Sequence, residues 1–186
     1  MRRRKDVSIP NMIFFGAAAG LAGAWAMSQF TKVWNGLLRP QRANALPLRR
    51  IPYSEQEWDS TSRIAGAIGS AALGRPLSAD EKKRGAVLVH YGVGGAAGIV
   101  YAILVQRRST ITNQCGALFG LGLWLIADEL LMPCLGLSRK RGSYSLQAQA
   151  NSLGEHLIYA AMADSVYRRL SRSSFLYGPR LCGPQR

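Results

Sequence analysis

The chain has 186 residues, a mean hydropathy close to zero and a formal net charge of +14. Its three cysteines form no CxxC pair, which argues against a disulfide framework and a zinc knuckle, and no HExxH, GxSxG, P-loop or dinucleotide motif indicates an enzyme or a cofactor. The charge alone would fit a nucleic-acid-binding protein, but no zinc-finger or aromatic-basic motif accompanies it, so nucleic acid is not a predicted partner.

The first apolar segment, Ile9 to Thr31, contains 23 residues and no charge. Because a helix needs roughly 20 residues to cross a hydrocarbon core of about 30 Å, this segment predicts a transmembrane span at about residues 10–31. Its Arg-rich start and the small residues at 22–24 also resemble a cleavable secretory signal. The apolar run continues past that point to Phe30, which favours an uncleaved anchor.

Residues 32–84 form a polar connector that carries four prolines. Within it, the small residues of segment 61–73 indicate a short helix that lies on the membrane or on the bundle. Ser78 and Glu81 have the spacing of a capping box, in which each side chain bonds the backbone N–H of the other residue. We therefore expect the helix of the second span to start there.

Two further apolar segments contain ionisable residues. Residues 85–106 carry no charge when His90 is neutral, and they are long enough to form the second span. Residues 113–135 predict the third span, which Asp128 and Glu129 interrupt and which Pro133 ends.

The fourth predicted span, residues 147–167, is the most polar, because Glu155 and His156 lie near its middle. A charge near the centre of a lone helix costs about 2.5–3.5 kcal/mol on insertion scales. The segment could therefore span only as the inner member of a bundle, and the alternative is an amphipathic helix outside the bilayer. Residues 168–186 follow as a polar, basic tail.

Together these segments predict an all-α integral membrane protein of one domain, with a four-helix transmembrane bundle. Lys and Arg flank the predicted spans, and such flanks fit the anionic headgroups of the lipid bilayer. Four spans place both termini on one side of the membrane. The long first connector carries less weight in the positive-inside rule, so we expect that side to be the cytoplasm.

Small residues recur four apart in the first three spans. Such rows let helix backbones approach closely in lipid, so they predict a compact bundle, and they are also compatible with a homo-oligomer. The rows contain Gly16 and Gly20, Gly94 and Gly98, and Gly116 and Gly120.

The segments also suggest an internal duplication. GAAAGLAGAW begins at Gly16 and GALFGLGLW begins at Gly116, and His90 and His156 each precede a tyrosine by eleven residues. This pattern fits two repeated helical hairpins related by an axis along the membrane normal. Helices rich in Gly and Ala also produce such matches by chance, so both interpretations stay open.

Antiparallel threading of four spans places the ionisable residues in one half of the membrane, beneath the connector. Ionisable side chains at that depth are costly and indicate a functional site. We expect an intramembrane polar site formed by His90, Asp128, Glu129, Glu155 and His156.

Three functions fit such a site. A proton or ion relay would make the chain a transporter-like protein that responds to pH, since an unperturbed histidine titrates near pH ~6.5. A structural or partner-binding subunit would use the same groups only in interhelical hydrogen bonds and in ion pairs such as Lys32 with Glu129 and Asp164 with Arg168. A membrane-embedded metalloenzyme is the third, because His and carboxylate side chains bind transition metals, although the sequence names no metal.

Several short motifs resemble the YagU-type family of small bacterial inner-membrane proteins. They are GAAAGLAG in the first span, His90-Tyr91 in the second, Pro133-x-x-Gly136-Leu137 in the third and Glu155-His156-Leu157 in the fourth. The resemblance implies a few-span helical protein of the inner membrane with no established activity. The chain departs from the family pattern at Ser152, where the family has a glutamate, and at Asp128, where a histidine can occur.

Overall fold

The computed structural model describes residues 8–43, 60–107, 115–135 and 146–177, and the regular elements in these ranges are all helices. The prediction of an all-α fold is therefore confirmed for the described residues. In chain order the elements are α1 (Ile9–Ala43), α2 (Ser60–Leu73), α3 (Ala79–Arg107), α4 (Cys115–Trp124), the π-helix η1 (Leu125–Leu131), α5 (Met132–Cys134) and α6 (Leu146–Tyr177).

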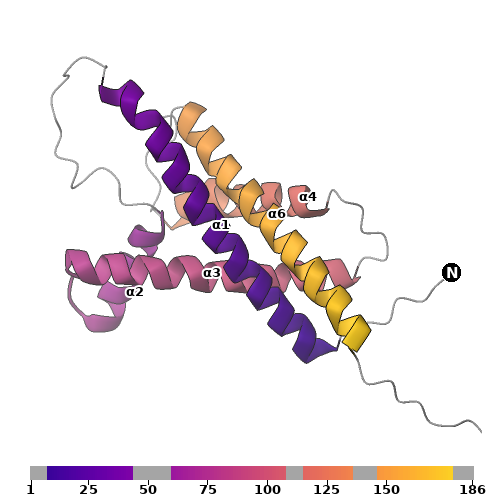
Figure 1. Cartoon of the computed structure of the whole chain (residues 1–186). Helices are drawn as coiled ribbons and strands as arrows, with labels where there is room; N and C mark the ends of the chain where they lie inside the picture. Colours follow the sequence, from indigo (N-terminus) through magenta and orange to yellow (C-terminus); the bar gives the residue numbers. More distant parts are fainter. Residues whose placement is uncertain (1–7, 44–59, 108–114, 136–145, 178–186) are drawn as a thin grey trace, which may run out of the picture.

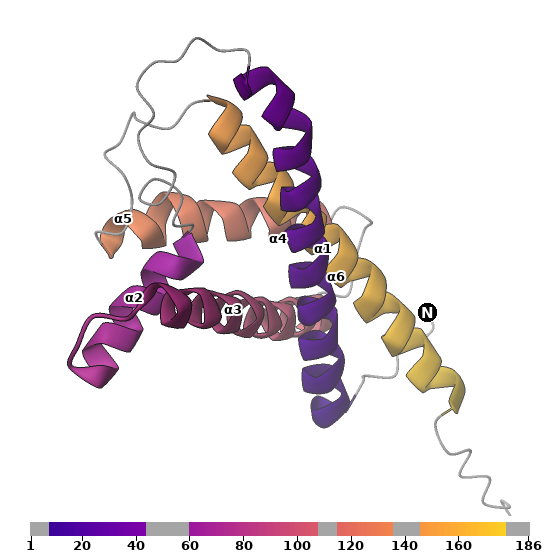
Figure 2. The same cartoon turned by 60° about the vertical axis from the view of Figure 1, so that its left-hand side comes forward.

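Two antiparallel helices, α1 and α6, lie side by side at the centre of the molecule (Figure 1). The α3 helix crosses α1, and α4 crosses α6, both at steep angles (Figures 1 and 2). The short α2 helix packs against the start of α3, away from the central pair (Figure 2). The central helices α1 and α6 therefore pack against each other and against one crossing helix each, and hydrogen bonds also join α6 to α3 and to η1.

The core of the molecule consists of small residues and tyrosines. Its buried members are Ala19, Ala24, Ala102, Ala160 and Ala163, together with Tyr101, Tyr159 and Tyr167. Large aliphatic and aromatic side chains point outward instead: Leu88 is 74% exposed, Phe14 is 67% exposed and Leu118 is 65% exposed. Water-soluble domains bury such residues, so this distribution is typical of helices that pack against one another in lipid.

Two described helices are long and apolar enough to cross a membrane, judged by length and composition. They are the Ile9–Trp34 part of α1 and the whole of α3, Ala79–Arg107. They correspond to the first and second predicted spans. The described parts of the third and fourth predicted spans are helical too, but they do not meet the same test.

The helices differ from the predicted segments in length and in regularity. The α1 helix continues to Ala43 and α6 to Tyr177, beyond the predicted ends at 31 and 167. Leu and Arg recur in both extensions, and their high helix propensity lets a helix continue after its apolar part ends. In the third segment, residues 125–131 form a π-helix, an interruption that hydropathy does not predict.

The predicted capping box at the start of α3 is confirmed. The backbone N–H of Ser78 donates to Oε2 of Glu81 at 2.8 Å, and the N–H of Glu81 donates to Oγ of Ser78 at 3.3 Å. Arg75 adds a two-pronged ion pair with Glu81, at 2.7 and 3.0 Å. Just before it, Gly74 has a φ of 64° and ends α2, as glycine commonly does after a helix. These contacts fix the corner between α2 and α3.

Candidate functional site

The crossing of α1 and α3 brings two backbones into contact. A Cβ atom at Gly20 would overlap the carbonyl oxygen of Gly94, and one at Gly98 would overlap the carbonyl oxygen of Gly16. A Cβ at Gly16 would also lie 2.9 Å from the Cβ of Ala102. No side chain fits between the helices at these positions, so the glycines set how closely α1 and α3 approach.

The crossing of α4 and α6 has the same pattern. A Cβ at Gly116 would lie 3.2 Å from the Cβ of Asp164, and one at Gly120 would lie 2.9 Å from both the Cβ of Ala160 and the carbonyl oxygen of His156. The two glycines of α4 therefore meet α6 as Gly16 and Gly20 of α1 meet α3. In both crossings the contacts run in opposite directions along the two helices.

The α1–α3 crossing and the α4–α6 crossing have equivalent contacts. The equivalent residues of α3 and α6, however, differ by one helical turn from those that the sequence match pairs. Gly20 faces the carbonyl of Gly94, and Gly120 faces the carbonyl of His156. By packing, the position in α6 that matches His90 in α3 is therefore Ser152, one turn before His156. The sequence match pairs the two histidines instead. The contacts agree with the packing register, because Ser28 bonds His90 just as Asp128 bonds Ser152.

His90 lies between α3 and α1. Its Nε2 atom is 2.9 Å from the carbonyl oxygen of Ala24 and 3.0 Å from Oγ of Ser28. Because a carbonyl oxygen only accepts, the contact with Ala24 requires a proton on Nε2. The ring is half-buried and held on the α3 side of α1.

Glu155 lies between α6 and α1. Its Oε1 atom accepts a hydrogen bond of 2.8 Å from the hydroxyl of Thr31 on α1 and another of 2.9 Å from Nδ2 of Asn151 on α6. His156 and Asp128 are close enough to act on it electrostatically. Glu155 is therefore a shared acceptor in a contact between helices from opposite ends of the chain.

Asp128 and His156 complete this side of the site. Ser152 donates its hydroxyl proton to Oδ2 of Asp128, which lies in η1. Nδ1 of His156 is 2.9 Å from the carbonyl oxygen of Ser152, so Nδ1 carries the proton in that contact. His156 is only 8% exposed. Short π-helical segments occur frequently at functional sites, which fits the position of η1 here.

The structure places three of the five predicted site residues near one another. Asp128 of η1 bonds α6 through Ser152, and Glu155 lies within electrostatic range of Asp128 and His156. His90 bonds Ala24 and Ser28 of α1, and no hydrogen bond between described residues joins it to those three. Glu129 is half-buried and makes no hydrogen bond or ion pair with a described residue. We refer to Asp128, Glu155 and His156 as the carboxylate–histidine site.

Four residues that sequence reasoning did not assign to the site supply its hydrogen-bonding partners. They are Ser28, Thr31, Asn151 and Ser152. Each is a hydroxyl or amide residue within one helical turn of a predicted site residue or of its partner. Polar residues three or four positions apart share a helix face, so this spacing was the available signal.

The described residues offer no donor set for a metal. No group of three or more His, Cys, Asp or Glu side chains among them could hold a metal ion.

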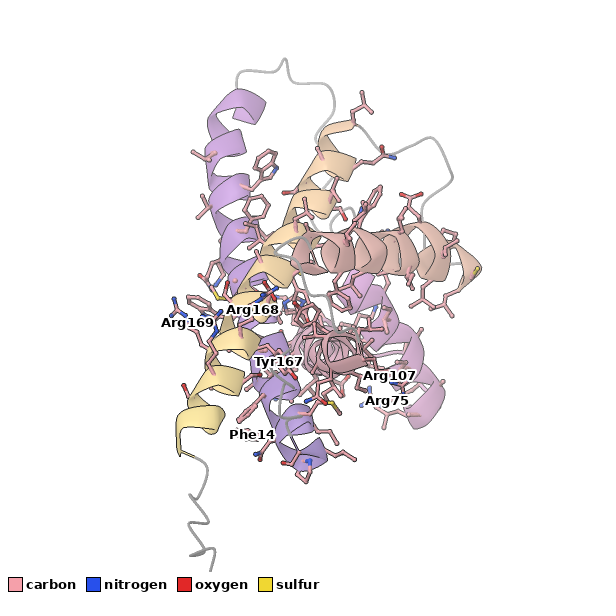
Figure 3. All side chains as sticks on the ribbon, turned by 90° about the vertical axis from the view of Figure 1, so that its right-hand side faces the viewer. Phe14, Arg75, Arg107, Tyr167, Arg168 and Arg169 are labelled. Atoms are coloured by element: carbon pink, nitrogen blue, oxygen red, sulfur yellow. The ribbon has the colours of Figure 1, made fainter. Side chains whose placement is uncertain are left out.

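A second polar cluster lies farther along α6. Asp164 accepts a hydrogen bond from the hydroxyl of Tyr101 on α3, and Nε of Arg168 lies 2.5 Å from its Oδ1. The predicted pair of Asp164 with Arg168 is therefore confirmed. No ion pair joins Lys32 to Glu129 in the part of the chain that the structure describes, so that prediction is not confirmed. Figure 3 shows Tyr167, Arg168 and Arg169 along this part of α6.

A scan against protein-family models, a search of curated proteins and a search of solved structures found no match to this chain. The resemblance to the YagU-type family therefore stays a prediction. Function has to be inferred from the geometry of the helices and of the two polar clusters.

Proposed function

We propose that the chain is a transporter-like membrane protein of four spanning helices whose carboxylate–histidine site responds to protonation. The membrane location is supported by the length and composition of α1 and α3 and by the outward-facing Leu, Val, Ile and Phe side chains. The inward position of α6, packed against α1 and α4, gives its polar residues shelter from lipid. A polar fourth span requires such shelter.

The observation that carries the proposed site is the position of Glu155. Its carboxylate accepts hydrogen bonds from Thr31 of α1 and Asn151 of α6, and it lies within electrostatic range of Asp128 and His156. Intramembrane Asp, Glu and His residues that lie close together form proton relays in pumps and transporters. The grouping at one helix junction thus supports proton exchange as the working chemistry.

Protonation of this site changes its hydrogen bonds in a defined way. An ionised carboxylate only accepts, whereas a protonated one also donates. The hydroxyl of Thr31 can reverse its role, whereas the amide Nδ2 of Asn151 can only donate, so a proton on Oε1 of Glu155 weakens that second contact. Proton occupancy is thereby linked to the bond within α6, between Asn151 and Glu155, and to the direction of the Thr31–Glu155 bond that joins α6 to α1.

Proton movement is the direct test. The purified chain is reconstituted into liposomes that contain a pH-sensitive dye, and the decay of an imposed pH gradient is followed. We expect faster decay with the wild type than with Glu155→Gln or Asp128→Asn. Glu129→Gln is the matched control, because Glu129 makes no bond to the site, and it should behave as the wild type. Equal decay in all four proteins would contradict transport.

A second candidate is a structural membrane subunit, favoured by the way the polar side chains join helices. Hydrogen bonds connect α1 with α3, α1 with α6, η1 with α6 and α3 with α6. On this interpretation the bonds only fix helix register. The substitutions above would then lower stability, and neither proton movement nor conformation would depend on pH through the site.

The proposed topology places both termini in the cytoplasm, and the resemblance to the YagU-type family favours the bacterial inner membrane. The antiparallel arrangement supports a shared side, because the start of α1 and the end of α6 lie at the same end of the molecule (Figure 1). The basic flanks of the predicted spans suit contact with anionic headgroups.

A further inference from the structure

The crossing of α1 with α3 is equivalent to the crossing of α4 with α6, through the glycine contacts and through one side-chain bond in each. Ser28 of α1 bonds His90 of α3. In the same position, Asp128 of η1 accepts the bond from Ser152 of α6. Counting along each helix from these residues gives the residues of α1 counterparts in α4 and η1, and those of α3 counterparts in α6.

The two helix pairs are joined through one face of α1 and one face of α6. Phe30 of α1 packs over Gly154 of α6, where an added Cβ would lie 3.2 Å from Cζ of the ring. One residue farther along each helix, Thr31 donates its hydrogen bond to Glu155. All four residues are half-buried. This junction is head-to-tail, because α1 of the first pair meets α6, which is the counterpart of α3, in the second pair.

The face of η1 that corresponds to this face of α1 is uncovered. The counterparts of Phe30 and Thr31 are Leu130 and Leu131, which are 59% and 47% exposed. Ile126, four residues before Leu130, is 60% exposed. We refer to these three apolar residues of η1 as the η1 face.

The α3 helix carries the second uncovered face. The counterparts of Gly154 and Glu155 in α3 are Gly92 and Val93. Gly92 is exposed and an added Cβ there would meet nothing within 4 Å, while Val93 is 57% exposed. Val100, two turns farther on, is 50% exposed. We refer to Gly92, Val93 and Val100 as the α3 face.

The two uncovered faces match each other in size and in polarity. In the existing junction a large side chain lies over a glycine, and at the equivalent place Leu130 would lie over Gly92. Next to it, the hydroxyl and carboxylate of the existing junction are both replaced by apolar side chains, Leu131 and Val93. A carboxylate opposite Leu131 would have no donor, so the two replacements are complementary. Glycine also lets helices approach closely in lipid.

The two faces do not meet within one chain. The described parts of α3 and η1 do not pack against each other, and α3 contacts α4 where the ring centroids of Tyr101 and Phe119 lie 5.0 Å apart. The backbone contacts of Gly20 with α3 and of Gly120 with α6 fix each outer helix to its central helix. Bringing the faces together within the chain would break such contacts, so a second copy is the partner that fits.

We propose that the chain forms a dimer in which the η1 face of one copy packs on the α3 face of a second copy. Leu130 then lies over Gly92, and Leu131 lies against Val93. Head-to-tail contacts close into rings when the rotation between units permits it, and each copy has one face of each kind. This inference rests on the proposed membrane location, because there both faces lie in lipid and meet in the plane of the bilayer.

Thiol cross-linking in membranes tests the contact, because detergent would cover the exposed apolar faces and separate the copies. Two differently tagged copies are co-expressed, one with Leu131→Cys and one with Val93→Cys, in chains whose own cysteines are changed to serine. A short bifunctional thiol reagent should give a product that carries both tags. Each variant expressed alone should give no product, and a product from Leu131→Cys alone would overturn the head-to-tail contact.

Leu125→Cys is the matched control for position. Leu125 is 43% exposed on the same π-helix, but its counterpart Trp25 is 54% exposed, so this position lies outside the face that joins the two pairs. Co-expressed with Val93→Cys, it should give little product. Equal product from Leu125→Cys and Leu131→Cys would show random collision in the membrane and overturn the contact.

A steric variant tests the fit of the two faces. Gly92→Trp, added to the copy with Val93→Cys, fills the place of Leu130 and should abolish the product, while the open space around Gly92 lets the single chain fold. Gly122→Trp in the same copy is the control, since an added Cβ at Gly122 also meets nothing within 4 Å, and it should leave the product in place. Product retained with Gly92→Trp would overturn the proposed packing.

Two further outcomes identify what has failed. Cross-linking within a chain that carries both cysteines, with no product between copies, would show that the faces meet inside one chain and overturn the dimer. Release of the chain from membranes by alkaline carbonate would contradict the membrane location, and the dimer with it. A chain that stays in the membrane and gives no product with both tags would overturn only the dimer.

Discussion

The hydroxyl of Thr31 on α1 donates a 2.8 Å hydrogen bond to the carboxylate of Glu155 on α6. The two residues come from the first and last helices, and the bond lies beside Asp128 and His156. This hydrogen bond therefore joins the two central helices, and a change of charge at Glu155 alters it directly.

Thr31→Val removes this donor with little change of shape. Hydrogen bonds between helices in membranes contribute about 0.6 kcal/mol on average and at most about 1.7, so we expect a loss in that range. Unfolding in mixed micelles of the single and double variants with Glu155→Leu measures the coupling, because leucine offers the hydroxyl of Thr31 no acceptor. Ser165→Ala is the control, because Ser165 is exposed and bonds only its own helix, at Ala161. Additive losses would show that the two residues are not coupled.

Gly20→Val should disrupt the α1–α3 crossing, because its Cβ would overlap the carbonyl oxygen of Gly94. Overpacking typically costs about 1–3 kcal/mol and here acts on backbone that has no flexible side chain to move. Gly92→Val is the matched control, since a Cβ at Gly92 meets nothing within 4 Å. Thermal unfolding in detergent compares the two. A Gly20 variant as stable as the Gly92 variant would contradict the close backbone contact between α1 and α3 at Gly20.

Asp164→Ala should destabilise the contact of α3 with α6. It leaves the hydroxyl of Tyr101 without its acceptor and the guanidinium of Arg168 without its counter-ion. A buried group that loses its partner costs about 1–3 kcal/mol, and we expect a value in this range. The double variant Asp164→Ala/Arg168→Leu should recover part of the loss in the same unfolding measurement. No recovery would show that the ion pair is not what Asp164 contributes.

The start of α1 and the end of α6 should face the same compartment. Single cysteines replace Ser8 and Ser173, both exposed, in a chain whose own cysteines are changed to serine. A membrane-impermeant thiol reagent applied to intact cells or spheroplasts should label both sites or neither. Labelling of only one site would mean that the chain crosses the membrane an odd number of times, which would contradict the four proposed spans.

Local signals in the sequence predict local structure well. The capping box of Ser78 and Glu81 was readable because its partners are three residues apart. The Asp164–Arg168 pair, one turn apart on a single helix, was readable for the same reason. Rows of glycine pointed to the faces where helices meet, because residues four apart share a face whatever the partner is.

The sequence does not predict which side chains meet across two different helices. Whether Asp128 meets a histidine or Ser152 depends on the register at which α4 crosses α6, and one helical turn separates the two outcomes. The π-helix at 125–131 shifts the backbone hydrogen bonds, and the hydropathy of the sequence does not predict this shift. The separate α1 partners of Glu155, which is Thr31, and of His90, which are Ala24 and Ser28, therefore required the three-dimensional arrangement.

The central claim is that protonation of the carboxylate–histidine site changes the packing of α6 against its neighbours. Spin labels at Leu118 on α4 and Ile158 on α6, both exposed, report the separation of these helices in liposomes. We expect the distance distribution to shift in the otherwise wild-type protein between about pH 5 and pH 8, the range in which an unperturbed histidine changes charge. The shift should disappear in Asp128→Asn/Glu155→Gln/His156→Ala and persist in Glu129→Gln. A distribution that is independent of pH, or a shift that survives the triple substitution, would contradict the claim.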